Sequence, residues 1–500
     1  MLSIAFALAC FLLVFLATRL FIIWLLRRQV RSTPDMTAKP ENHDSFVIKP
    51  YIQLGDNHKQ AERENLDLIW FTKDRDHLWA VEVKSADAKR WIQPERAREE
   101  RITIDSIKPL RKLQVHLSNL VPGVAFDYRV LKDGNIVFSA QATARKSASQ
   151  SYRFVAVGDL ASGTAGAKKV AYQMWLAKPD LVLIPGDHVY KYGRLSEYLD
   201  HYYPIYNRDK GQPHQGGPLL RSTPFVVAFG NHDAGTPDTW DVRDLDQMPD
   251  LLAFFVVLSQ PLNGPLATAG SANTPDLHGA KHRKEDFLTA AGKNFPRIAN
   301  FSFDYGNAHW LVLDGNNYMD WTNPELRAWV EQDLAQAKST WKFVAFHQPA
   351  FSSDIKHHDE QRMRLLVDIF QRRGVDVVFS GHNHAYERNY PLSFTRTLQP
   401  DGSEMSVEGR VSGEFVLDKT FDGKTNTSPH GIVYLVTGGG GGKLSLEPTR
   451  RADHGHLPPF TFKLVDDIHS FTVCDLSNTT LTVRQISEDG QELDSFTITK

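Results

Sequence analysis

The sequence predicts an α/β fold, preceded by a smaller all-β region and an apolar N-terminal segment. From about residue 151, short runs of β-branched and aromatic residues alternate with helical patterns, which is typical of buried, largely parallel strands. The hundred residues before them hold short alternating segments that resemble half-buried strands. The chain has 500 residues, 41% of them hydrophobic and 23% charged, as expected for a globular protein of two or three domains.

The apolar segment runs from Ile4 to Leu26 and is interrupted only by Thr18 and Arg19. Its length suffices for a bilayer-spanning helix of about 20 residues. No basic region precedes it beyond the amino terminus, and no clear small-x-small site follows it, which disfavours a cleaved signal peptide. We therefore expect a single-pass transmembrane anchor over residues 1–31, followed by a polar linker.

The linker, residues 32–45, leads into a predicted β-sandwich over residues 46–147. About seven short strands are expected there, two of them joined by a hairpin at Asp133-Gly134. The main domain follows over residues 151–500. Two stretches depart from its pattern, at about 235–296 and 391–430. The first is rich in proline, glycine and threonine and follows the Asn231-His232 pair directly, so it is expected to line or cover the site. The second is predicted to be an inserted hairpin.

Helices of the main domain are predicted from apolar periodicity and end signals. Asn323 and Pro324 provide a cap and a first-turn proline, and Gly374 closes another helix. The predicted helices span 164–178, 194–203, 323–337 and 359–373. Further strands are predicted at 309–316, 469–476, 480–487 and 493–499. The glycine run 438–442 follows a strand and is interpreted either as a phosphate cradle or as a tight turn near the site.

Five apolar runs of this domain end at polar residues. The runs are 154–157, 181–185, 225–229, 343–346 and 377–380. The polar residues behind them are Asp159, Asp187, Asn231 with His232, His347, and His382 with His384. Parallel strands deliver their C-terminal ends to one edge of a sheet, so these side chains are expected to converge there.

Carboxylate, amide and imidazole donors without thiolate suit iron, manganese or zinc. Six or seven such ligands are too many for one tetrahedral ion, so two metal ions are predicted. Asp187 is the natural bridge, because a carboxylate can give one oxygen to both ions. The two cysteines, Cys10 and Cys474, allow neither a disulfide framework nor a cysteine metal site. The net charge of −2 gives no electrostatic case for nucleic-acid binding.

The five blocks together resemble a known family. Gly158-Asp159, Gly186-Asp187-x-x-Tyr190, Gly230-Asn231-His232, His347 and Gly381-His382-x-His384 stand in the order found in purple acid phosphatases, which are calcineurin-like metallophosphoesterases. The resemblance implies a two-sheet αββα sandwich that hydrolyses phosphate monoesters. It also implies that the all-β region is similar to the fibronectin-III-like domain of larger family members.

The resemblance further implies one Fe(III) ion and one divalent ion of iron, zinc or manganese. The first ion would be held by Asp159, Asp187, Tyr190 and His384. The second would be held by Asp187, Asn231, His347 and His382. A metal-bound hydroxide would attack phosphorus directly, so no protein nucleophile is implied.

Three histidines are candidate catalytic residues. His232 lies beside the ligand Asn231 and is expected to meet the phosphate, with Asp233 orienting its ring. His357 and His358 follow His347 by about ten residues, where plant members carry an adjacent histidine pair. The spacing here is about one residue longer, and the alternative interpretation is a solvated loop. A structural role is predicted for Asp314, and ion-pair roles are predicted for Glu387 and Arg388.

Two rival functions stay open. One is a phosphodiesterase of the same superfamily without the redox-active iron, which Tyr190 disfavours. The other is a catalytically silent membrane scaffold or receptor, which the intact ligand set disfavours. The membrane face is also open. Arg27, Arg28 and Arg31 follow the apolar segment and indicate a cytoplasmic enzyme, whereas the resemblance indicates an extracytoplasmic one.

Overall fold

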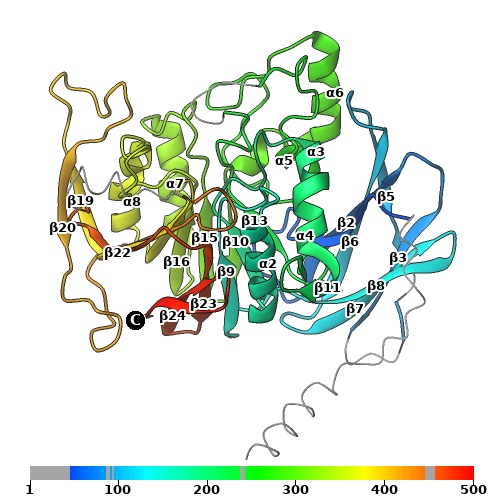
Figure 1. Cartoon of the computed structure of the whole chain (residues 1–500), viewed down its shortest axis with the longest axis horizontal. Coiled ribbons are helices and arrows are strands. Elements are labelled where there is room, and N and C mark those ends of the chain that lie inside the picture. The colour runs from blue at the N-terminus through cyan, green and yellow to red at the C-terminus, as the bar shows by residue number, and fades with distance from the viewer. Residues whose placement is uncertain (1–44, 86–89, 93–94, 237–242, 445–456) are drawn as a thin grey trace, which may run out of the picture. The chain divides into compact units, whose positions relative to one another are not determined.

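The structure is a computed structural model that describes residues 45–85, 90–92, 95–236, 243–444 and 457–500 (Figure 1). The predicted anchor over residues 1–31, and all but the last residue of the predicted linker, lie outside this range. Within the described residues, no helix is both long enough and apolar enough to cross a bilayer.

Two four-stranded antiparallel sheets form the all-β region. One has the order β1–β2–β6–β5 and the other the order β4–β3–β7–β8. The first contains β1 (Ile48–Gln53), β2 (Glu64–Lys73), β6 (Leu110–Leu120) and β5 (Arg98–Ile102). The second contains β4 (Glu95–Arg96), β3 (Trp79–Ser85), β7 (Ala125–Lys132) and β8 (Asn135–Thr143). The hairpin at Asp133-Gly134 joins β7 to β8 as predicted, whereas the likeness to fibronectin III stays a prediction.

Two larger sheets form the α/β region, with the orders β13–β10–β9–β23–β24–β25 and β14–β15–β16–β17–β21–β18–β22. The six-stranded sheet contains β13 (Phe225–Val227), β10 (Leu181–Ile184), β9 (Tyr152–Ala156), β23 (Ser470–Leu476), β24 (Thr480–Ser487) and β25 (Glu492–Thr499). The seven-stranded sheet contains β14 (Phe301–Tyr305), β15 (Ala308–Val312), β16 (Trp341–Ala345), β17 (Val377–Ser380), β21 (Val433–Thr437), β18 (Tyr386–Asn389) and β22 (Thr461–Val465). The five strands that precede the candidate ligands pair in parallel within their sheets, as predicted.

Aromatic side chains hold the two sheets face to face. The ring of Phe154 in β9 lies 4.9 Å from Trp310 in β15, and 5.8 Å from both Phe343 in β16 and Phe379 in β17. Helix α2 (Ala165–Ala177) packs on the six-stranded sheet, while α7 (Pro324–Gln336) and α8 (Val367–Arg372) pack on the seven-stranded sheet. The layers therefore follow the order α, β, β, α that the resemblance implies.

Helix ends follow the capping signals in two cases and depart from prediction in another. Thr164 caps α2 and Asn323 caps α7, each through its side-chain oxygen. The helix expected over 359–373 is shorter and consists of a 3₁₀ turn (Arg362–Leu366) and α8. The Asp354 carboxylate accepts hydrogen bonds from the backbone N–H groups of Lys356 and His357, which favours a turn ahead of the expected helix.

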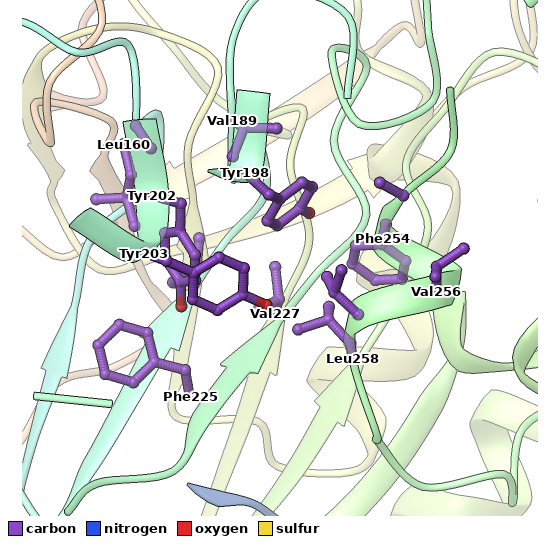
Figure 2. Close-up of a cluster of buried hydrophobic side chains, with 14 of the residues drawn as sticks. Leu160, Val189, Tyr198, Tyr202, Tyr203, Phe225, Val227, Phe254, Val256 and Leu258 are labelled. Atoms are coloured by element: carbon purple, nitrogen blue, oxygen red, sulfur yellow. The ribbon is translucent and has the colours of Figure 1, made fainter. Parts of the chain in front are cut away.

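The segment predicted as a helix over 194–203 is a succession of short turns that ends in α4 (Tyr203–Tyr206). It begins with α3 (Leu195–Glu197) and a π-helical turn (Tyr198–Tyr202). A small hairpin follows, formed by β11 (Asn207–Gln212) and β12 (Gly216–Pro218). Figure 2 shows tyrosines of these turns beside Phe225 and Val227 of β13 in the buried core.

The described residues of both inserts include helices or strands. The first contains α5 (Phe254–Val257), α6 (Lys281–Ala291) and 3₁₀ turns at Gly292–Asn294 and Arg297–Ala299. The ring of Phe254 in α5 lies 4.7 Å from Phe229, two residues before the candidate ligand Asn231. The second insert contains the antiparallel strands β19 (Leu392–Arg396) and β20 (Gly413–Leu417), which confirms the predicted hairpin.

The all-β region and the α/β region share buried contacts. Tyr51 of β1 belongs to the same apolar cluster as α5, and its hydroxyl donates a 2.5 Å hydrogen bond to the carbonyl of Val257. The guanidinium of Arg145 has no exposed surface and forms an ion pair with Glu64. It also donates a 3.0 Å hydrogen bond to the carbonyl of Asp304 in β14. These contacts join the two regions into one unit.

Candidate metal centre

The predicted ligands converge where strands of both large sheets end. Asp159, Asp187 and Asn231 follow β9, β10 and β13 of the six-stranded sheet. The histidines follow β16 and β17 of the seven-stranded sheet. Four of the seven side chains belong to buried residues, and the other three are partly exposed, so the centre is deep on one side and accessible on the other. The buried ones are Asp159, Asp187, His347 and His382, and the partly exposed ones are Tyr190, Asn231 and His384.

Tyr190 lies at the middle of the first group of donor atoms. Its hydroxyl oxygen is 2.9 Å from Oδ1 of Asp159 and 3.1 Å from Oδ2 of Asp187. The same oxygen lies 3.0 Å from Nε2 of His384. Three other potential ligands thus lie within hydrogen-bonding distance of one phenol oxygen.

Asn231 lies at the middle of the second group. Its Oδ1 atom is 3.0 Å from Nε2 of His347 and 3.1 Å from Nδ1 of His382. Nε2 of His347 also lies 3.1 Å from Oδ2 of Asp187. Asp187 therefore belongs to both groups, in the position expected of a bridging carboxylate.

Three of the ligands have left-handed backbone conformations. The φ angles are +59° at Asp159, +51° at Asp187 and +69° at His382. Such conformations cost free energy for residues with a side chain, and they cluster at functional sites where the surroundings hold them. The backbone N–H of His382 donates to the Asp159 carboxylate at 3.0 Å, and the N–H of His232 donates to Oδ1 of Asp187 at 2.9 Å. The loops therefore hold one another in place.

Glycines allow the same loops to approach closely. Gly186 has a φ of +88°, and a Cβ atom there would overlap the ring of His347. In the glycine run, a Cβ atom on Gly438 would lie 2.6 Å from Oδ2 of Asp159. One on Gly442 would lie 2.6 Å from the ring of His384. These contacts favour the interpretation of the run as a tightly packed turn beside the site.

Buried charges of both signs shift the pKa values in the centre. Burial alone would raise the pKa of Asp187, but the imidazoles of His347 and His232 hold it well below its ordinary value. Burial likewise opposes protonation of His347, yet Asp187 raises the pKa of that ring to about 10. Burial, with Asp159 and Asp187 nearby, raises the pKa of the Tyr190 phenol well above its usual range. Protons on the histidines thus compensate the negative charge of the buried carboxylates, and bound cations would compensate the same charge.

The donor set fits two metal ions. Each group supplies four potential ligands from carboxylate, imidazole and either phenol or amide groups, with Asp187 common to both. In the second group, the amide oxygen of Asn231 points at two imidazole nitrogens. The three atoms lie as close together as ligands of one ion. No sulfur takes part, and the one described cysteine, Cys474, is buried in β23.

His232 lies beside the first group. Its Nδ1 donates a 2.7 Å hydrogen bond to the carbonyl of Lys191, which leaves Nε2 on the side of the centre, 3.7 Å from Oδ2 of Asp187. The expectation that Asp233 orients this ring is wrong. The Asp233 carboxylate instead accepts from the backbone N–H groups of His188 and Gly230, so it ties together the loops after β10 and β13.

The structure separates the two neighbouring histidines. The ring of His357 lies 4.2 Å from the ring of His382, and its Nδ1 is 2.6 Å from Oε1 of Glu360. The side chain of His358 is 52% exposed. It donates a hydrogen bond from Nδ1 to the carbonyl of Ile355. Only His357 is brought to the candidate ligands.

Glu360 was not predicted as a site residue. Its Oε2 atom lies 3.2 Å from Nε2 of the candidate ligand His382. The sequence signal was a carboxylate three residues beyond His357, a spacing that is common for reasons unrelated to catalysis. Its contact with His382 depends on how the loop folds onto β17, which the sequence pattern does not reveal.

Other residues near the centre have structural contacts. Asp314 accepts hydrogen bonds from the backbone and side chain of Asn316, in line with its predicted structural role. Arg388 forms the predicted ion pair, with Asp494. Glu387 makes no ion pair within the described residues and instead accepts from Ser353 and Thr461.

Comparisons with known proteins agree with this geometry. The family model for calcineurin-like phosphoesterases matches residues 152–386. Purple acid phosphatase 23 of Arabidopsis thaliana is 36% identical over 109 residues, covering 20% of this chain and 23% of that protein. Purple acid phosphatase 18 of the same plant is 25% identical over 241 residues, covering 47% and 44%. The chain thus spans less than half the length of each of these two relatives.

A solved structure extends the comparison to most of the chain. Purple acid phosphatase PPD1 from yellow lupin (Lupinus luteus) seeds superposes with a TM-score of 0.57 at 17% identity, covering 90% of this chain and 74% of that one. The fold is that of a purple acid phosphatase-like metallophosphoesterase. In this metallophosphoesterase fold, the candidate ligands occupy the loops that follow parallel strands of both sheets.

Proposed function

We propose that the chain is a dinuclear-metal phosphohydrolase that acts as an acid phosphatase on phosphate monoesters. The observation that carries the proposal is the pair of donor groups centred on Tyr190 and Asn231, with Asp187 common to both. A purely structural cluster has no need for seven converging metal-type donors in strained loops. The similarity to purple acid phosphatases supports the same conclusion.

The two donor groups differ in the ions they favour. The group around Tyr190 offers a phenol and two carboxylates, hard oxygen donors that suit Fe(III). The group around Asn231 offers two imidazoles, an amide and the shared carboxylate, which suit a divalent ion of iron, zinc or manganese. When bound, two such ions would polarise phosphate oxygens and make a water molecule acidic enough to react near neutral pH.

The chain's own residues would bind the phosphate and handle the leaving group. His232 has its Nδ1 anchored to the carbonyl of Lys191, so Nε2 is free to donate to a phosphate oxygen or to the departing alkoxide. His357 packs against His382 of the second donor group, where a second donor would meet the phosphate. His358, which the sequence also suggested, has no place in this scheme because it is turned to solvent.

A metal and substrate survey tests the proposal. The purified chain should contain two metal ions by mass spectrometry and hydrolyse p-nitrophenyl phosphate faster below pH 7 than above it. Its turnover of bis-p-nitrophenyl phosphate should be much lower. Asp187→Ala, which removes the shared carboxylate, should lose both ions and nearly all hydrolysis. Preference for the diester would instead identify a phosphodiesterase, and a metal-free, inactive wild-type chain would indicate a silent scaffold.

The membrane placement is a separate proposal. An anchor over residues 1–31 would hold the enzyme at a membrane, with the catalytic region outside the cytoplasm by resemblance. Fusion of the first 45 residues to a reporter enzyme, followed by membrane fractionation and protease protection, would test both parts. A soluble reporter would contradict the anchor, and a protected cytoplasmic reporter would follow the charge rule instead.

A further inference from the structure

Glu360 links two histidines that belong to different parts of the candidate site. Its Oε1 atom is 2.6 Å from Nδ1 of His357, and its Oε2 atom is 3.2 Å from Nε2 of His382. The two imidazole rings lie 4.2 Å apart. One carboxylate therefore contacts both a candidate metal ligand and a candidate phosphate donor.

The contact with His382 has a direct chemical meaning. Nδ1 of this ring lies 3.1 Å from Oδ1 of Asn231 in the second donor group. Nε2 is buried, has no well-aligned hydrogen bond within the described residues and lies 3.2 Å from Oε2 of Glu360, the carboxylate to which a small rotation would let it donate. A neutral imidazole carries one proton, so a ring that donates Nε2–H to a carboxylate presents the Nδ1 lone pair to a cation. Carboxylates commonly fix metal-binding histidines in this way. Glu360 would thus set both the tautomer and the orientation of His382.

The same carboxylate fixes His357. With Nδ1 held by Glu360, the other ring nitrogen, Nε2, is the one left for a substrate oxygen. The His357 side chain is 15% exposed and that of Glu360 is 25% exposed, so the pair is reachable from solvent at the edge of the centre.

The hairpin insert holds the loop that carries this pair. The backbone N–H of Gln361 donates to the carbonyl of Gly409 at 3.1 Å, and its side chain accepts from the N–H of Val411. Arg410 makes a two-pronged ion pair with Asp359, at 2.6 and 2.8 Å. These contacts fix the segment immediately around Glu360, so its carboxylate has a defined position between the two rings.

We propose that Glu360 is a positioning residue that acts through both histidines, through His382 on the second metal ion and through His357 on the substrate. The inference has two halves: a metal half, in which Glu360 acts through His382, and a substrate half, in which it acts through His357. It deepens the proposed phosphatase function, and only the substrate half depends on that function. The metal half concerns the protein without substrate.

Glu360→Gln tests the metal half. Glutamine keeps the volume of the side chain but cannot accept protons from both rings, because one of its two terminal atoms is itself a donor. Equilibrium dialysis against zinc buffered by a chelator, without substrate, should show that the weaker-bound ion loses about 10- to 100-fold in affinity. Glu414→Gln is the matched control, since that carboxylate is exposed on β20, takes no part in the contacts around Glu360 and should leave zinc affinity unchanged.

A double-mutant cycle tests the substrate half. At saturating zinc, Glu360→Gln should lower kcat more than it raises KM. In a His357→Ala background the same substitution should no longer change kcat, while its effect on zinc affinity should persist. Thermal unfolding of the metal-free variants should match the wild type.

The outcomes separate this inference from the proposed function. Wild-type zinc affinity in Glu360→Gln, or equal effects on kcat with and without His357, would overturn the positioning role while leaving a phosphatase. A wild type that binds zinc but hydrolyses no ester would overturn the phosphatase, and the affinity measurement would still decide the role of Glu360 toward His382.

Discussion

Gly381 lies so close to Asp159 that a Cβ atom on the glycine would sit 2.6 Å from the carboxylate oxygen Oδ2. The two residues follow strands of different sheets, β17 and β9, so their loops meet across the sandwich. The same Cβ atom would lie 2.7 Å from the carbonyl of Pro185 and 3.1 Å from Nδ1 of His347. This one position therefore borders both donor groups.

Gly381→Ala should displace Asp159 and His347 and reduce the content of both metal ions, with at least a tenfold loss of phosphatase activity. The added methyl group has no flexible neighbour to move, because a backbone carbonyl and two ligands surround it. Metal content and turnover measure the effect. Gly402→Ala is the control, since its Cβ atom would meet nothing within 4 Å and the strain at its φ of +84° is confined to an exposed turn of the hairpin insert. Normal metal content in Gly381→Ala would contradict the close packing described.

His232→Ala should retain both metal ions and lose about 10²–10³-fold in kcat. The histidine is placed to meet the phosphate through Nε2, and losing one such donor typically has an effect of this size. Metal analysis and steady-state kinetics on a monoester measure it. His358→Ala, which removes an exposed histidine, should change neither quantity. Turnover within a small factor of wild type would assign His232 a structural role.

Tyr190→Phe should abolish visible absorption in protein prepared with iron. A phenolate bound to Fe(III) absorbs visible light by ligand-to-metal charge transfer, and phenylalanine removes the oxygen that lies between Asp159, Asp187 and His384. Absorption spectra of wild type and variant at equal iron content measure it. A colourless, fully active wild type that binds only zinc or manganese would show that the site holds two divalent ions.

His309 should make stability depend on pH away from the metal centre. Burial alone would lower its pKa, but hydrogen bonds with Asp304 and Asp333 raise it to about 9, from an ordinary value near 6.5. Because the folded-state pKa is raised, the stabilisation is complete below about pH 6.5 and is lost as pH rises through about 9. At about 1.4 kcal/mol per pKa unit, the stabilisation amounts to at most about 3.5 kcal/mol.

Urea unfolding of the metal-free protein at pH 6 and pH 9.5 measures the contribution of protonated His309 to the free energy of unfolding. The free energy of unfolding should fall more between these pH values in wild type than in His309→Gln, which has no proton to lose. Identical pH profiles would mean that the two carboxylates do not hold the histidine in its charged form.

The arrangement of the ligands could be predicted from the sequence because two simple patterns coincide. Every ligand except Tyr190 comes shortly after an apolar run, as Asp187 follows Leu181–Ile184, and parallel strands end at a common edge. Helix α2 also ended close to its predicted limits, since Thr164 is a strong cap and acts locally. The helix near Glu360 was overestimated, because the turn that Asp354 stabilises competes with helical hydrogen bonds.

Partners across the fold could not be predicted. Asp233 was paired with its neighbour His232, yet it bonds to the backbone of His188, 45 residues earlier. Glu360 reaches His382 only because its loop is folded against the loop that follows β17. Such pairings depend on loop conformations, and sequence periodicity carries no information about these.

The buried Arg145 has a consequence for how the molecule loses its structure. Its charge is neutralised by Glu64 of the all-β region, and it also bonds to the carbonyl of Asp304 in the α/β region. Arg145 and Glu64 both belong to the all-β region, so parting the two regions would keep this ion pair, remove its Asp304 acceptor and expose it to water, where ion pairs contribute little. Neither half can therefore melt ahead of the other at low cost. Unfolding of the all-β strands would also remove the contact between Tyr51 and Val257 beside α5, so cleavage within these strands is expected to destabilise the α/β region as well.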